Sequence, residues 1–207
     1  MRTLLLRLAG PLQSWDSRRR LVTPERGKSV TFLASREYVD GAPTHAGIVG
    51  FLGCALGRER GSDMSDLNAL DVVVRVDQPG RAHVEFRTKQ DPRRKWPECF
   101  AEQVVHDAVF LVAVAGDAGL VEAAAAALLS PRWPLYLGKR EYPPTPPIVL
   151  GVVDGGAEAA VREHQWIASQ WWRERRAGSA DLLVVRRLPI PRDDQSVRLD
   201  GVPVTMG

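Results

Sequence analysis

The sequence predicts an α+β fold in a chain of 207 residues, long enough to bury a substantial core. Three observations carry this prediction. Leucines alternate at the start of the chain from Leu4 to Leu8, a capped helical pattern runs from Thr44 to Leu56, and a β-branched run covers Asp71 to Asp77. Strand and helix patterns therefore follow one another along the chain.

The first strand has alternate leucines on one face and ends at a Gly-Pro break. Residues 12–42 contain prolines, glycines and an arginine triplet, so we expect mostly loop there, with a short strand near 29–33. Thr44 suits a helix N-cap, and Gly57 ends that helix.

The next elements follow from β-branched and apolar runs. The strand at Asp71–Asp77 leads through a Pro-Gly turn into a strand candidate at Arg81–Thr88. A further strand at Val104–Ala115 precedes a helix at Leu120–Leu129. The order strand, helix, strand, strand, strand, helix is close to a ferredoxin-like βαββαβ unit.

We expect this core to occupy residues 1–150 and a small C-terminal extension, 151–207, to pack on it. The extension has a helical pattern around Ala157 to Arg176 and strand patterns near Leu182 to Arg187 and Val197 to Val204. Core packing is the preferred interpretation for three late tryptophans, Trp166, Trp171 and Trp172.

Composition narrows the class of protein. Apolar residues make up 44% and charged residues 26% of the chain, which is typical of a folded globular protein. Neither Cys54 nor Cys99 belongs to a CxxC or a Cys/His cluster, so we expect no structural zinc and no other metal or cofactor. The chain shows no leader and no apolar run of membrane-spanning length. We expect a reduced, cytoplasmic protein without a membrane partner.

The net charge of +3 barely favours an anionic partner, but the cations are clustered. Such clusters are usually solvated surface. Because these lie in segments broken by proline and glycine, they favour binding of a polyanionic partner. The clusters are Arg18, Arg19, Arg20, Arg26 and Lys28, then Arg87, Lys89, Arg93, Arg94 and Lys95.

The end of the first strand and the start of the first helix together indicate single-stranded RNA. The strand end offers an amide, a hydroxyl and an indole, and the first turn of the helix has free N–H groups at its positive end. Such groups suit phosphates and unstacked bases. The residues expected to bind RNA here are Gln13, Ser14, Trp15, Thr44, His45 and Gly47. For Gly50 and Gly53, tight packing of the helix on the sheet is at least as good an interpretation as a phosphate contact.

Catalysis is the minority interpretation. The four histidines show no spacing that singles out a pair, and the carboxylates form no two-metal set. A metal-independent ribonuclease that uses Tyr38 and His45 stays open as an alternative.

Six segments follow one another in the order found in a known family. They are LLLRLAGPLQSW, PTHAGIVGFLGCALGR, LDVVVRVDQPG, the strand ending Phe86-Arg87-Thr88, HDAVFLVAV and PLYLGKREYPPTPP. Over about its first three quarters the chain resembles the CasD-type, type I-E branch of the Cas-five family of CRISPR-associated proteins. The resemblance implies an RRM-like core with a protruding β-hairpin thumb, and segment 81–98 is the thumb candidate.

The resemblance implies a non-catalytic subunit of the Cascade complex in antiviral defence. Members cap the 5′ handle of the CRISPR RNA and contact the backbone subunit and the large subunit, and target DNA is a further partner in the assembled complex. A generic RNA-binding module outside CRISPR defence is the other non-catalytic alternative. The remaining residues expected to bind RNA are Arg18, Arg19, Arg20, Arg87, Thr88, Arg93, Arg94, Lys95, Lys139 and Arg140.

Two of the chain's departures from the family pattern concern expected site residues. His45 and Ala46 replace a cation and a serine, and Arg87 stands where the family offers an imidazole. A guanidinium stays protonated at working pH and cannot act as a base, so the second departure argues against RNA cleavage.

Overall fold

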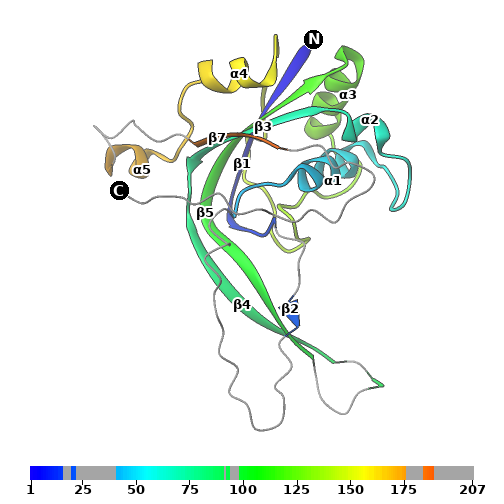
Figure 1. Cartoon of the computed structure of the whole chain (residues 1–207), viewed down its shortest axis with the longest axis vertical. Coiled ribbons are helices and arrows are strands. Elements are labelled where there is room, and N and C mark those ends of the chain that lie inside the picture. The colour runs from blue at the N-terminus through cyan, green and yellow to red at the C-terminus, as the bar shows by residue number, and fades with distance from the viewer. Residues whose placement is uncertain (16–19, 22–40, 91, 94–97, 176–183, 189–207) are drawn as a thin grey trace.

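A mixed α+β structure is seen in the computed structural model, which describes residues 1–15, 20–21, 41–90, 92–93, 98–175 and 184–188 (Figure 1). This confirms the predicted α+β class. In chain order the elements are β1 (Arg2–Gln13), β2 (Arg20–Leu21), α1 (His45–Leu56), α2 (Ser65–Asn68), β3 (Asp71–Gln78), β4 (Arg81–Lys89), β5 (Glu98–Gly116), α3 (Ala118–Leu129), β6 (Val149–Asp154), α4 (Ala157–Glu163), α5 (Gln170–Arg175) and β7 (Val184–Arg187).

The strands form one antiparallel sheet in the order β6-β1-β5-β3-β7. The 19-residue strand β5 is its central element, and both β2 and β4 also pair with it. The register of β1 against β5 runs from Arg2 opposite Gly116 to Gln13 opposite Val105. Strands from the beginning and the later part of the described chain, β1 and β7, therefore belong to the same sheet without being neighbours.

Each face of the sheet is covered by helices. The alternate leucines of β1 predicted to share a face are fully buried against α1 and α3. The opposite face, with Leu5, Val73 and Leu111, packs against α4 through Ala157 and Val161. The strand alternation thus builds three layers (Figure 1).

Helix α1 begins and ends where local signals predict. The Thr44 hydroxyl accepts a hydrogen bond from the Gly47 amide, and Gly57 closes the helix with a φ of 74°. No helix in the described ranges is long and apolar enough to cross a bilayer.

A β-hairpin arm extends from the sheet (Figure 1). It consists of β4 and the first half of β5, paired from Arg81 opposite His106 to Lys89 opposite Glu98. Between β3 and β4, Gly80 has a φ of +69°, and a Cβ there would lie 2.3 Å from the His106 carbonyl oxygen. The structure therefore places the first part of the thumb candidate, residues 81–89, in this arm together with its β5 partner.

The prediction of a single helix over residues 157–176 is wrong. Residues up to 175 form two short helices, α4 and α5, separated by an extended stretch. Strand β6 is an element that the sequence patterns missed. The strand predicted at 182–187 is confirmed over β7, whereas the strand patterns at 29–33 and 197–204 lie outside the described residues.

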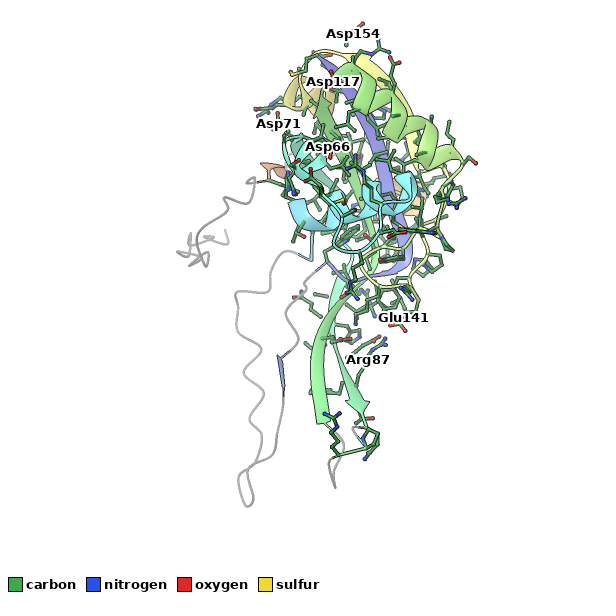
Figure 2. All side chains as sticks on the ribbon, turned by 90° about the vertical axis from the view of Figure 1, so that its right-hand side faces the viewer. Asp66, Asp71, Arg87, Asp117, Glu141 and Asp154 are labelled. Carbon is green, nitrogen blue, oxygen red and sulfur yellow. The ribbon has the colours of Figure 1, made fainter. Side chains whose placement is uncertain are left out.

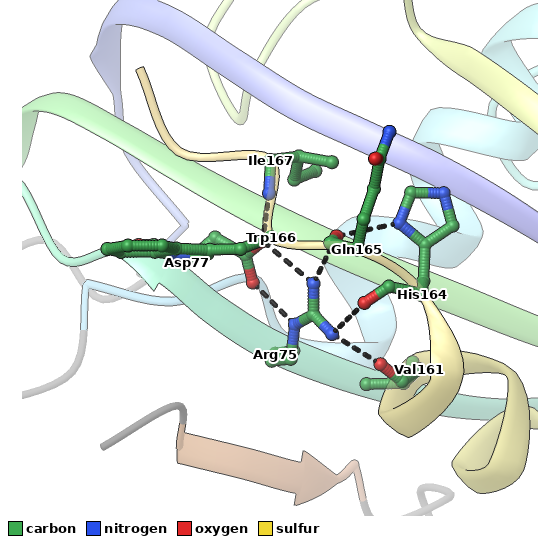
Figure 3. A network of polar contacts seen from close by, with 7 residues as sticks. All are labelled: Arg75, Asp77, Val161, His164, Gln165, Trp166 and Ile167. Atoms are coloured by element: carbon green, nitrogen blue, oxygen red, sulfur yellow. Dashed lines mark hydrogen bonds and ion pairs between the residues drawn. The ribbon is translucent and has the colours of Figure 1, made fainter. Parts of the chain in front are cut away.

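A buried guanidinium holds the stretch between α4 and α5 (Figure 3). Arg75, only 3% exposed, donates to both carboxylate oxygens of Asp77 and to the backbone carbonyls of Val161, His164 and Gln165, at 2.6 to 2.9 Å. All five N–H groups of the arginine have acceptors. The stretch between α4 and α5 is therefore tied to the second face of the sheet.

Candidate nucleic-acid interface

The strand end around Trp15 is part of the core. Gln13 is fully buried, donates to the Ala108 carbonyl at 2.8 Å, and accepts from the Trp15 indole N–H at 2.9 Å. The Ser14 hydroxyl donates to the Gln103 carbonyl at 2.9 Å. Because Trp15 is only 5% exposed, the structure gives its ring a packing role instead of the predicted stacking on a base.

The start of α1 lies against this strand end, as the sequence predicts. A Cβ on Gly47 would lie 2.9 Å from Cε3 of Trp15, so Gly47 makes room for the indole and not for a phosphate. Its amide is already bonded to the exposed Thr44. Of the three residues predicted to bind RNA here, Thr44, His45 and Gly47, only Thr44 is exposed.

His45 is also a core residue, at 4% exposure. Its Nε2 lies 3.2 Å from the Leu70 carbonyl oxygen, which can only accept, so Nε2 carries the proton. Nδ1 is buried without a hydrogen-bond partner. The predicted RNA contact of His45 is not available in this arrangement, and neither is its alternative role as a catalytic base.

Charged residues meet where the arm leaves the core (Figure 2). Glu85 and Glu102 are opposite one another in the β4–β5 register, which alone would be repulsive. Arg87 lies 3.2 Å from Glu85, 3.3 Å from Glu102 and 2.5 Å from Glu141, and Lys139 pairs with Glu102. We call these five residues the arm-base cluster.

The arm-base cluster changes the interpretation of two predicted RNA contacts. Its three carboxylates outnumber its two cations, so Arg87 and Lys139 are already neutralised inside the protein. The hydrogen bond from Arg87 lowers the pKa of Glu141 below its ordinary value, and burial raises the pKa of the adjacent Tyr142 to about 12. The cluster fixes the segment between α3 and β6 to the arm.

The other predicted cations and Thr88 are distributed around the arm. Thr88 and Arg93 are exposed on it, and Arg140 is exposed beside its base. Arg20 lies in β2, which pairs with β5 opposite Ala101 and so runs along the arm. The remaining predicted cations, Arg18, Arg19, Arg94 and Lys95, and the alternative nuclease residue Tyr38 lie outside the described residues.

Comparison with known proteins identifies the family. The family model described as CRISPR-associated protein (Cas_Cas5) matches residues 3–205. The chain belongs to this Cas5 family. The family resemblance found in the sequence is thereby confirmed.

Relatives of this Cas5 chain include the CRISPR system Cascade subunit CasD of Escherichia coli (strain K12), 30% identical over 172 residues that span 72% of this chain and 70% of the relative. Two solved structures are similar in fold. A Cas protein crystal structure aligns with a TM-score of 0.54 and 38% identity over 77% of this chain and 69% of the other. A chain of a CRISPR RNA-guided surveillance complex aligns with a TM-score of 0.56 and 31% identity over 78% and 66%.

Two features of the Cas5 arm were missed by sequence reasoning. Phe86 is 58% exposed, on the strand face that also carries Val84 and Thr88. The two-residue alternation of β4 could have separated this face from that of Arg87. The second feature is a pair of imidazoles, His83 and His106, whose ring centres lie 5.1 Å apart across the base of the arm. Their residues are 23 positions apart, so no local spacing indicates the pair.

Proposed function

We propose that this Cas5 chain is a non-catalytic subunit of a type I CRISPR interference complex that binds and caps the 5′ handle of the CRISPR RNA. The similarity to a Cascade subunit and to a chain of an RNA-guided surveillance complex supports this assignment. The observation that carries it is the arm, which extends from the core with an exposed aromatic ring at Phe86. Exposed rings are the platforms on which unpaired bases stack.

A ferredoxin-like, RRM-like core is part of the proposal. Helix α1 connects β1 to β3, α3 connects β5 to β6, and the four strands lie in the order β6-β1-β5-β3. This connectivity supports a βαββαβ unit in which the arm is an elongation of the hairpin between its second and third strands.

We place the proposed RNA contacts mainly on the arm instead of at the end of β1. Phe86 takes the stacking role first assigned to Trp15, and the cations on and beside the arm contact phosphates. In the described residues these cations are Arg20, Arg93 and Arg140, and Arg18, Arg19, Arg94 and Lys95 are further candidates by sequence. Thr88 on the arm and Thr44 at the start of α1 are the proposed uncharged contacts.

The position of His45, the catalytic base in the alternative nuclease hypothesis, supports the non-catalytic assignment. His45 is buried with Nε2 bonded to a carbonyl, so it cannot reach a 2′-hydroxyl. Within the described residues no group of His, Cys, Asp and Glu could hold a metal ion. We further propose the backbone subunit, the large subunit and target DNA as partners in a cytoplasmic complex.

The test is RNA binding by the full chain with Phe86 changed to Ala. Loss of a stacked base weakens binding of handle-containing repeat RNA by about 1–3 kcal/mol, and Phe86→Tyr restores it. Leu129→Ala is the matched control, because Leu129 is 75% exposed on α3, outside the arm. Equal affinity of the Phe86→Ala and Leu129→Ala proteins would contradict the proposal.

A further inference from the structure

Helix α5 presents an aromatic ring to solvent. None of its residues is buried, and Trp171 is 45% exposed. Tryptophan is highly buried on average, so a ring this exposed, on a helix with no buried residue, is a candidate binding surface. This corrects the expectation that Trp171 packs in the core.

Two arginines accompany the ring. The Arg175 guanidinium carbon lies 5.8 Å from the centre of the Trp171 ring, and Trp172 meets the same ring edge-on at 5.5 Å. The carboxylate within the helix, that of Glu174, accepts a hydrogen bond from Gln170. Neither exposed guanidinium, of Arg173 or of Arg175, forms an ion pair in the parts of the chain that the structure describes.

The helix has a fixed place beside the root of the arm. The Ser169 amide and hydroxyl, just before α5, donate to Oε1 of Gln78 at 3.1 and 2.5 Å, and Gln78 donates to the Asp107 carbonyl at 2.6 Å. Gln78 is the last residue of β3, where the arm begins. In Figure 1 α5 lies beside the sheet, apart from α1 and α3.

We infer that α5 is a second nucleic-acid contact, in which an unpaired base stacks on Trp171 and phosphates bind Arg173 and Arg175. An exposed indole beside two exposed guanidinium groups that have no ion pair among the described residues supplies both interactions that a single strand needs. The ligand is a single strand of either RNA or DNA, because both carry base faces and phosphates. This contact lies outside the arm and is independent of the proposed handle binding.

The experiment measures binding of the full chain to two labelled oligonucleotides, handle-containing repeat RNA and single-stranded DNA of unrelated sequence. Trp171→Ala lowers affinity for at least one of them by about five-fold or more, and Trp171→Phe retains most of it. Replacing Arg173 and Arg175 by Ala together flattens the slope of log affinity against log salt by about 1.4. Trp133→Ala is the control, because Trp133 is also exposed but follows α3.

The two oligonucleotides distinguish an RNA ligand from a DNA ligand. Loss with RNA alone assigns α5 to the guide, loss with DNA assigns it to a DNA strand, and either supports the inference. Unchanged affinity for both strands in a Trp171→Ala protein with wild-type circular dichroism overturns it. Phe86→Ala tests the handle site separately, so failure of one proposal leaves the other measurable.

Discussion

Changing Gly47 to Ala tests whether Trp15 packs on the start of α1. The new Cβ would lie 2.9 Å from Cε3 of Trp15 and 3.1 Å from Oγ1 of Thr44. The indole cannot move aside freely, because it is buried and bonded to Gln13. Overpacking of this kind costs about 1–3 kcal/mol.

Gly50 provides the matched control in the same helix. A Cβ at Gly50 meets nothing within 4 Å, so Gly50→Ala gains helix propensity of about 1 kcal/mol without a clash. Both substitutions receive a propensity gain, so the difference between them measures the crowding at Gly47, whose nearest atom belongs to Trp15. We expect the Gly47→Ala protein to be less stable than the Gly50→Ala protein by about 1–3 kcal/mol. Urea unfolding of the full chain measures this difference. Equal stability would refute the packing role of Trp15 and return its ring to the candidates for base stacking.

Three further predictions concern the buried ion pair of Arg75 and Asp77, the arm-base cluster and catalysis. Arg75→Met leaves the Asp77 carboxylate buried without its cation, so the free energy of unfolding falls by about 3–5 kcal/mol; a loss below about 1 kcal/mol in urea unfolding would contradict this. Glu141 has a lowered pKa, so its stabilising contribution is present above the unfolded value of 4.5 and is lost as the pH falls through the lower folded value. The stability difference between wild type and Glu141→Gln therefore disappears on acidification, and a difference that grows would show the sign to be wrong. In the presence of a chelator, the chain leaves repeat RNA intact; specific cleavage abolished by His83→Ala would instead identify the imidazole pair as catalytic.

The sequence predicted best the elements whose signals are local. The N-cap at Thr44 and the closing glycine at Gly57 each act within a few residues, so the bounds of α1 could be predicted. The Pro-Gly turn before Arg81 likewise marks the start of the arm.

The errors arose where distant residues decide the structure. Gln13 bonds to Ala108, 95 positions away, so the polar residues around Trp15 satisfy one another inside the core instead of facing RNA. The helical pattern after Ala157 is interrupted where carbonyls of the chain bond to Arg75. Such competition between a helix and a buried guanidinium leaves no local pattern.

The most direct test of the proposed function is a footprint of the CRISPR RNA in the assembled complex. The 5′ handle is probed with a single-strand nuclease in complexes that contain either wild-type chain or Phe86→Ala chain. If this Cas5 chain caps the handle through its arm, the wild-type complex protects the handle, and the Phe86→Ala complex exposes it while the rest of the RNA stays protected. Equal protection of the handle in both complexes would contradict the account.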